Sequence, residues 1–184
     1  CMGQQLDMDF ENIDDVSINQ YLEMIRLKTA VLVACAFKMG GIISGTSLNN
    51  QENLYHFGQN LGIAFQIQDD LLDIYGNPKT FGKQIGGDII ENKKTYLFLK
   101  ALELSSNDDN NQLKHLFSIK PKDSTAKIET VKQIYDLYDV KTASLKCIEG
   151  YTNEALKALK NVNLSDNKKQ VLKEFAEELM QRDV

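Results

Sequence analysis

Proline is scarce in this sequence: only Pro78 and Pro121 occur among 184 residues. Because proline breaks the interior of a helix, long stretches of the chain are free to be helical. Apolar and polar residues do not alternate over any useful length, and there is no repeat or low-complexity tract, so nothing favours strands. We therefore predict an all-α fold in which helices pack around one core.

Cysteine is also scarce. The three cysteines, Cys1, Cys35 and Cys147, are odd in number and far apart, and no CxxC spacing occurs. This usage indicates free thiols in a reducing compartment, so we expect a cytoplasmic protein. The most apolar stretch, residues 30–37, is followed by Lys38. It is shorter than the roughly 20 residues that cross a bilayer, so we expect no membrane span.

The sequence has no run of basic residues, and its net charge is −5. Because no basic stretch can follow a phosphate backbone, we expect no nucleic-acid partner. The overall charge also repels small anions. A substrate that carries phosphate therefore needs lysines placed locally, or metal cations, to bind.

Helical periodicity dominates the part of the chain that precedes residue 76. Ile18, Tyr21 and Ile25 recur at spacings of three and four, which marks an amphipathic helix. Residues 28–43 are apolar nearly all round, as in a helix buried among other helices. We predict a second long helix over residues 51–75, because Gly76-Asn77-Pro78 is a strong helix breaker.

The second half of the chain is also expected to be helical. After a glycine-rich loop at residues 77–88, the pattern predicts helices at 93–104, 124–139, 141–160 and 166–181. Ser165 is the expected N-cap of the last of these helices. The polar segment 105–112, rich in Asn and Asp, is predicted to be a surface connection.

Three aspartates lie together near the end of the second long helix. Asp69 and Asp73 are four residues apart and share a face, and Asp70 is three residues before Asp73. On the face that carries Asp69 and Asp73, the residue one turn earlier is the apolar Phe65, and the opposite side of the helix is apolar too. No ordinary solvated face is left for these acids, and Gln66 lies one turn before them.

This acidic cluster needs a cation. Carboxylates are disfavoured at the negative end of a helix dipole, and like charges four residues apart repel each other. Ligands that offer only oxygen select a hard ion such as Mg²⁺, which shares substrate phosphates. The alternative from the residues alone is an ordinary acidic surface patch, and the two interpretations stay open.

Lysines flank the acidic segment. Lys83 follows a glycine in the loop, and Lys93 follows the loop's end, so a loop closing over a metal-bound diphosphate is one interpretation. Ordinary surface lysines are the other. Asp88 is expected to cap the following helix in a pair with Glu91, or to act as a ligand.

Another lysine, Lys28, lies with Thr29 at the start of the apolar helix at residues 28–43. A cation and a hydroxyl at the mouth of a core helix suit a phosphate-binding cavity. A lysine that extends its ammonium from a buried run to solvent is the alternative.

Four sequence blocks together resemble a known family. FQIQDDLLD, followed by GKQIGGDIIENKKTYL, is similar to the second aspartate-rich region of trans-type prenyl diphosphate synthases, such as farnesyl and geranylgeranyl diphosphate synthases. Upstream, KTA at residues 28–30 and GQQLD at residues 3–7 resemble two further segments of that family, in the same order and spacing. The resemblance covers residues 3–97. Beyond residue 105 only the helical character and the Gln181-Arg182 tail are similar.

The resemblance implies an isoprenoid synthase-type helical bundle around a central cavity. The implied activity is prenyl transfer: an allylic prenyl diphosphate ionises with Mg²⁺, isopentenyl diphosphate attacks the cation, and a proton leaves. It also implies a homodimer. The implied metal residues are Asp69, Asp70 and Asp73: Asp69 ligates Mg²⁺ directly, and Asp70 and Asp73 bind it through water or support its ligands. The other implied roles are diphosphate binding by Lys28, Lys83 and Lys93, carbocation stabilisation by Thr29 and Gln66, and cavity lining by Gln4 and Asp7, with Asp88 as a weaker candidate.

The chain departs from the family pattern in one large respect. No second DDxxD motif occurs, and Arg26 and Arg182 are the only arginines, so the arginine pair near the family's first motif is missing too. The chain also begins Cys-Met-Gly. We therefore expect residues 1–184 to be the C-terminal part of a single synthase domain whose N-terminal helices carry the first motif. We expect the isolated chain to be inactive.

Three other functions remain open at this point. The chain could be a non-catalytic partner subunit of an active synthase, although a scaffold has no need of three buried acids. It could be a class I terpene cyclase, but the NSE-type second motif of those enzymes is not found. It could also be a helical structural module with an acidic patch.

Overall fold

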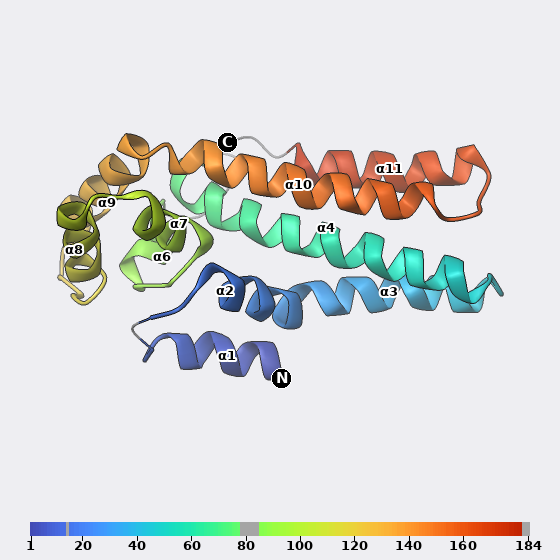
Figure 1. Cartoon of the computed structure of the whole chain (residues 1–184), viewed down its shortest axis with the longest axis horizontal. Helices are drawn as coiled ribbons and strands as arrows, with labels where there is room; N and C mark the ends of the chain where they lie inside the picture. The colour runs from blue at the N-terminus through green and yellow to red at the C-terminus, as the bar shows by residue number, and fades with distance from the viewer. Residues whose placement is uncertain (14, 78–84, 182–184) are drawn as a thin grey trace. The chain divides into compact units, whose positions relative to one another are not determined.

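The computed structural model describes residues 1–13, 15–77 and 85–181, and every regular element in these ranges is helical. This confirms the all-α prediction. In chain order the elements are α1 (Met2–Phe10), α2 (Ile18–Ile25), η1 (Arg26–Ala30), α3 (Val31–Ile43), α4 (Leu48–Tyr75), α6 (Gly87–Ile90), α7 (Tyr96–Leu104), α8 (Asn107–Leu116), α9 (Thr125–Leu137), α10 (Val140–Lys160) and α11 (Asp166–Met180) (Figure 1). Within the described ranges, no helix is both long enough and apolar enough to cross a membrane.

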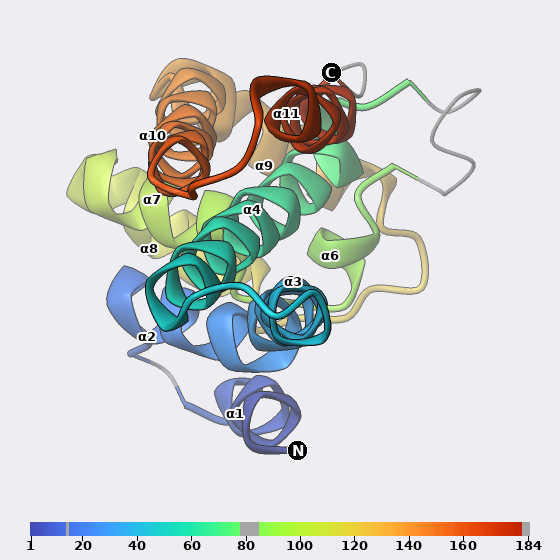
Figure 2. The same cartoon turned by 90° about the vertical axis from the view of Figure 1, so that its right-hand side faces the viewer.

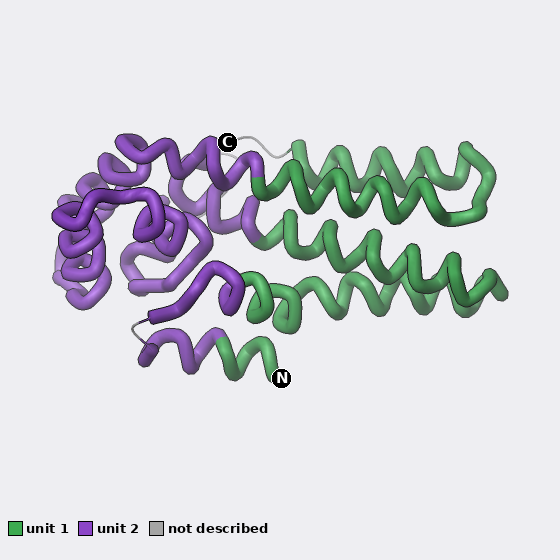
Figure 3. The backbone as a smooth tube through the Cα atoms, viewed as in Figure 1, with its two compact units in different colours: residues 1–6, 22–66, 147–182 green, residues 7–21, 67–146, 183–184 purple. Residues whose placement is uncertain are grey.

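The helices form two compact units (Figure 3). Unit 1 contains residues 1–6, 22–66 and 147–182, and unit 2 contains residues 7–21, 67–146 and 183–184. The helices α1, α2, α4 and α10 each contribute residues to both units.

Unit 1 is a bundle of long helices, in which α3 lies along α4 and α10 lies along α11 (Figures 1 and 2). Phe57 and Leu61 of α4 are fully buried, and Phe37 of α3 packs edge-on against Phe57 with ring centroids 4.9 Å apart. Small residues let the helices approach closely, since a Cβ on Gly58 would lie only 2.9 Å from the Cα of Ala34. The core consists of Leu54, Phe57, Leu61, Ala155, Ala158, Leu159, Val162 and Ala176.

Unit 2 packs the shorter helices α6 to α9 around the last turns of α4. Leu71 and Ile67 of α4 are fully buried. Phe98 of α7 stacks on Phe117, which ends α8, with ring centroids 4.0 Å apart. The last turns of α4, which carry the aspartates, thus contribute buried apolar side chains to this unit.

The prediction of a surface connection at residues 105–112 was wrong, because this segment begins helix α8. Ser106 is its N-cap, and its hydroxyl accepts a hydrogen bond from the Asp109 amide. Asp108 and Asp109 occupy the first turn, with Lys114 and His115 in the last, as the helix dipole favours. The Asn and Asp residues that suggested a loop are thus the first turns of a helix.

The remaining helices agree with the expected ranges, with small shifts at their ends. The long second helix begins at Leu48 rather than at residue 51, and the helix expected from residue 93 begins at Tyr96, with Thr95 as its N-cap. Ser165 does occupy the N-cap position of α11, but its side chain makes no capping hydrogen bond to any described residue. Helices α1 and α6 had no counterpart among the helices expected from the sequence, and the start of α6 lies in the segment predicted to be a loop.

Candidate functional site

The candidate residues divide between the two units. Unit 1 holds Gln4, Lys28, Thr29 and Gln66. Unit 2 holds Asp7, Asp69, Asp70, Asp73 and Lys93. Lys83 lies outside the described residues.

In unit 1, Lys28 and Thr29 lie on a π-helical turn, η1, instead of the continuous α-helix that was expected. A π-helical turn of this kind is frequent at functional sites. Gly3 and Gly62 have no side chain, so their backbones can lie close to this turn. A Cβ on Gly3 would lie 2.2 Å from the Lys28 nitrogen, and one on Gly62 would lie 2.7 Å from the Cα of Ala30. The backbone of the GQQLD segment therefore lies directly against the KTA segment, which explains the glycine at position 3.

The structure brings Thr29 and Gln66 together. The Thr29 hydroxyl donates a hydrogen bond of 3.1 Å to Oε1 of Gln66, so the two predicted stabilisers of the cation form one polar pair. Lys28 and Gln4 are exposed. An exposed ammonium beside this pair in the sequence can attract an anionic ligand.

In unit 2, Asp70 is buried and is held by two donors. Its Oδ2 accepts a hydrogen bond from the Tyr21 hydroxyl and one of 3.3 Å from the Tyr96 amide at the start of α7. Burial raises the pKa of Tyr21 well above its usual value, and the charge and hydrogen bond of Asp70 add to this rise. Tyr21 therefore stays a donor at any ordinary pH, and Asp70 is fixed in place.

Asp73 is buried against the start of α6. Its Oδ2 accepts a hydrogen bond of 3.0 Å from the Asp88 amide, and the Gly87 amide donates to it as well. Burial raises the pKa of Asp73 from 3.8 to about 6, and the negative charge of Asp88 contributes to this rise, although the two amides and Lys93 oppose it. The carboxyl thus carries an unfavourable charge that a nearby cation would stabilise.

Lys93 lies among several carboxylates. Its ammonium donates a hydrogen bond of 2.8 Å to Oδ1 of Asp88. Burial lowers the pKa of Lys93, but the hydrogen bond and charge of Asp88, followed by the charges of Asp7 and Asp70, outweigh it and raise the pKa. Predicted site residues Asp7, Asp70 and Lys93 are therefore electrostatically coupled in the folded unit.

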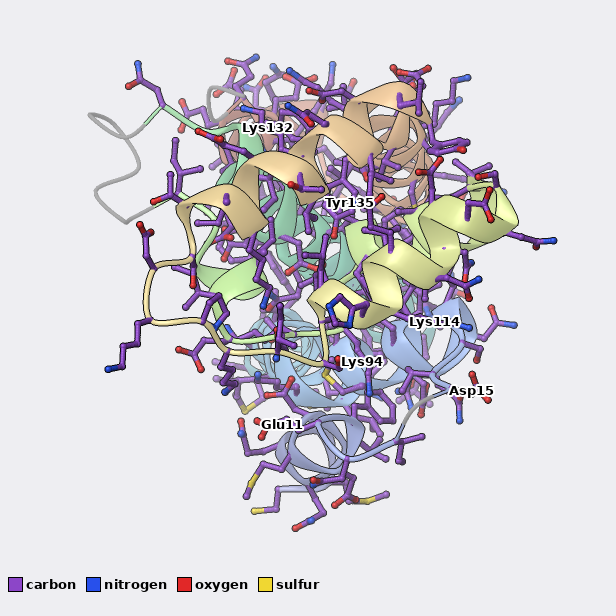
Figure 4. The ribbon with its side chains drawn as sticks, turned by 90° about the vertical axis from the view of Figure 1, so that its left-hand side faces the viewer. Glu11, Asp15, Lys94, Lys114, Lys132 and Tyr135 are labelled. Carbon is purple, nitrogen blue, oxygen red and sulfur yellow. The ribbon has the colours of Figure 1, made fainter. Side chains whose placement is uncertain are left out.

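The prediction that Asp88 caps the next helix was wrong. Asp88 lies in the first turn of α6, whose N-cap is Gly86 in the left-handed conformation, and α7 has its own cap. The Asp88 side chain is instead the acceptor for Lys93. Its neighbour Lys94, labelled in Figure 4, donates instead to the carbonyls of Phe10, the last residue of α1, and of Ile13.

The donor chemistry of unit 2 fits a hard divalent cation. The acids whose charges act on Lys93, which are Asp7, Asp70 and Asp88, offer only oxygen ligands. Within the described residues, no three Asp, Glu, His or Cys side chains converge into a ready metal site. That is expected of Mg²⁺, which is usually held by one or two carboxylates with water and substrate phosphates. Asp69, which is only partly buried, lies on the same helix as the firmly held Asp70 and Asp73.

Sequence reasoning missed the partners of these aspartates. Tyr21 was assigned to the apolar face of an amphipathic helix, and no local signal marked its hydroxyl as a donor to a residue 49 positions away. The backbone amides of Asp88 and Tyr96 were also missed. Gly86-Gly87 was the available signal, because two glycines let a turn bring amides against a carboxylate.

Replacing Asp73 with Asn should change how stability depends on pH. The folded-state pKa lies above the unfolded one, so protonated Asp73 stabilises the fold below about pH 4, and this contribution is lost as the pH rises through about 6. Without metal, Asp73→Asn should therefore gain roughly 1 kcal/mol relative to the wild type between pH 4 and pH 7, after allowance for solvent screening. Urea unfolding at several pH values checks this. Asp108→Asn, an exposed acid, is the control, and parallel curves for Asp73→Asn and wild type would contradict the prediction.

Comparisons with known proteins find chains that are similar to this one. The polyprenyl synthetase family model matches residues 1–138. A geranylfarnesyl diphosphate synthase from Natronomonas pharaonis is 48% identical over 101 residues, which are 55% of this chain and 30% of that protein. A crystal structure of a geranylgeranyl pyrophosphate synthase is 46% identical with a TM-score of 0.93, over 100% of this chain and 57% of that one.

A further structure, a geranylgeranyl pyrophosphate synthase from Corynebacterium glutamicum complexed with isoprenyl diphosphate and magnesium, is 28% identical with a TM-score of 0.88, over 98% of this chain and 51% of that one. The fold is thus that of the all-α isoprenyl diphosphate synthases. The chain belongs to the polyprenyl synthetase family. It spans 30% of the Natronomonas relative and a little over half of each of these two structures.

Proposed function

We propose that this chain carries the second aspartate-rich half of the active site of a trans-type prenyl diphosphate synthase. The substrates would be an allylic prenyl diphosphate and isopentenyl diphosphate. The observation that carries the proposal is the charge cluster in unit 2, where Asp88 accepts a hydrogen bond from the Lys93 ammonium and the charges of Asp7 and Asp70 also act on that ammonium. This excess of negative charge favours a bound cation, and the exposed lysine favours an anion beside it.

Each residue has a separate task in this proposal. Asp69 would ligate Mg²⁺, while buried Asp70 and Asp73 would hold the helix end in place and support the metal's water shell. A bound Mg²⁺ would supply neutralisation of the diphosphate charge. Lys93 and Lys28 would hold diphosphate oxygens, and Lys83 is assigned the same role from sequence alone.

The pair of Thr29 and Gln66 would act on the carbon chain. When the allylic C–O bond breaks, its electron pair leaves with the diphosphate and a cation remains. The oxygens of Thr29 and Gln66 would direct their dipoles at that positive charge. Gln4 and Asp7 are assigned to the lining of the substrate cavity from the family resemblance alone. The double bond of isopentenyl diphosphate then forms the new C–C bond, and a proton is lost.

Chain elongation tests this proposal. We expect residues 1–184 alone to incorporate no labelled isopentenyl diphosphate, because the sequence contains only one DDxxD motif. Joined to the preceding segment of the geranylgeranyl pyrophosphate synthase that is 46% identical, the chain should elongate an allylic diphosphate when Mg²⁺ is present. Elongation by the isolated chain would refute the half-site proposal. A folded fusion without turnover would refute the assigned function.

One observation favours a second candidate, a partner subunit of a synthase. In unit 1, helix α3 exposes the large apolar side chains of Leu32, Met39, Ile42 and Ile43. Exposed apolar surface of this kind marks a contact surface for other helices. Stable co-purification with a complete synthase, without any contribution to its turnover, would favour this candidate. The homodimer and the cytoplasmic location stay predictions.

A further inference from the structure

A buried lysine on α9 contacts the turn that precedes Lys93. Lys127 has only 3% of its surface exposed. Its ammonium donates to Oδ1 of Asn92 and, at 3.0 Å, to the carbonyl of Ile119. It also lies 5.5 Å from the centre of the Phe117 ring. Because a buried ammonium is costly, its few partners determine where it can lie.

Asn92 has an unusual backbone conformation. Its φ is 61°, in the left-handed region that non-glycine residues seldom adopt. It lies just past α6 and ends that helix with a paired motif: the Asn92 amide donates to the Ile89 carbonyl at 3.2 Å, and the Lys93 amide donates to the Asp88 carbonyl at 2.9 Å. Glycine usually fills this position and asparagine is the next choice, so contacts of the Asn92 side chain can hold the residue in this conformation.

The Asn92 side chain is held at both ends. Its Oδ1 accepts from Lys127, and its Nδ2 donates to the Ile119 carbonyl at 3.3 Å. Lys127 donates to that same carbonyl. The three groups form a closed triangle that joins the turn after α6 to the connection between α8 and α9.

That turn also fixes Lys93. Lys93 is attached to Asp88 twice, through its amide to the Asp88 carbonyl at 2.9 Å and through its ammonium to Oδ1 at 2.8 Å. Asp88 itself donates its amide to Asp73. If Asn92 left the left-handed conformation, the hydrogen bond of the Lys93 amide would be lost and the ammonium would point elsewhere.

We propose that Lys127 is a positioning residue for Lys93, which acts by holding Asn92 in the left-handed turn that aims the Lys93 ammonium at the diphosphate. The inference rests on the proposed function, because it supposes that Lys93 binds diphosphate. Burial lowers the pKa of Lys127, and the charge of nearby Lys120 lowers it further. This is consistent with an ammonium held mainly by two neutral acceptors, Oδ1 of Asn92 and the carbonyl of Ile119.

Hydrogen exchange tests the positioning directly, without any ligand. We expect Lys127→Met to speed exchange of the Lys93 amide about tenfold, since the turn opens locally. Asn92→Gly should leave it within about twofold of wild type, because glycine adopts this conformation without strain. The double variant should also stay near wild type, since a glycine at position 92 no longer needs Lys127. Lys127→Leu, which also removes the donor, replaces Lys127→Met if the latter is poorly folded, with the same expected result.

Lys132→Met is the matched control. Lys132 follows on the same helix as Lys127, and Tyr135 one turn further on (Figure 4). Its ammonium lies 5.2 Å from the centre of the Tyr75 ring and not at the turn. It should leave exchange at Lys93 unchanged. Unchanged exchange in Lys127→Met, or fast exchange that persists in the double variant, would overturn the inference.

A ligand measurement separates this inference from the proposed function. With Mg²⁺ and inorganic pyrophosphate, Lys127→Met should weaken pyrophosphate affinity about tenfold, and Asn92→Gly should restore it in the double variant. A purely structural loss at Lys127 would not be rescued at Asn92. If wild type binds but Lys127→Met binds equally well, only the positioning role fails. If wild type binds no pyrophosphate, the proposed function fails, and the exchange experiment still decides the role of Lys127.

Discussion

Asp69→Ala is expected to lower kcat about 10²- to 10³-fold in the fusion that elongates allylic diphosphates, because it removes transition-state charge stabilisation. The structure distinguishes Asp69 from its neighbours. Asp70, which accepts from Tyr21 and Tyr96, and Asp73, which accepts from the start of α6, are both buried. Asp69 is only partly buried. Its greater access to solvent suits a metal ion that keeps several waters.

The control for this experiment is Asp108→Ala, which removes an exposed acid from α8 and should leave kcat unchanged. Steady-state rates with labelled isopentenyl diphosphate give kcat and KM separately. Turnover retained by Asp69→Ala would remove this residue from the mechanism. A rise in KM alone would mean that Asp69 contributes to substrate binding but not to the reaction.

Asp70→Ala should have the largest effect on stability among the three aspartates. It leaves the buried Tyr21 hydroxyl without its acceptor and also removes the acceptor of the Tyr96 amide. We expect a loss of about 3 kcal/mol in the free energy of unfolding, and about 2 kcal/mol for Tyr21→Phe, which removes a hydrogen bond to a carboxylate. Urea unfolding at pH 7 measures both.

The double variant isolates the contact between the two side chains. Because Tyr21→Phe removes the hydroxyl that Asp70→Ala would leave unsatisfied, their combined loss should be smaller than the sum by about 1 kcal/mol. Strict additivity would show that the hydrogen bond contributes nothing. In that case the short helix α2 would not be fixed to α4 by this pair.

The fold was largely predictable because its signals are local. The apolar periodicity of residues 18–25 and the breaker at Gly76 are recognised within a few positions, and they gave helices close to those observed. Helix α8 was missed because its polar cap and first turn resemble a loop. The π-helical turn at Arg26–Ala30 was missed because its sequence continues the pattern of an ordinary helix, and the backbones that lie against it, at Gly3 and Gly62, are distant in sequence.

The site was predictable in its residue types but not in its contacts. The DDLLD spacing correctly placed three acids near the end of one helix, with two of them buried. The hydrogen-bond donors to these carboxylates come from segments 15 to 49 residues away, namely from Asp88, Tyr96 and Tyr21. The support of Lys93 by Lys127 through Asn92 is equally remote, since it joins positions 35 residues apart.

Calorimetric titration of the 184-residue chain with inorganic pyrophosphate, with and without Mg²⁺, tests the central claim most directly. We predict binding that requires Mg²⁺ and is lost in Asp69→Ala but kept in Asp108→Ala, because the acids at the end of α4 attract the anion only through a cation. Pyrophosphate binding that is equally strong without Mg²⁺, or that survives Asp69→Ala, would contradict this.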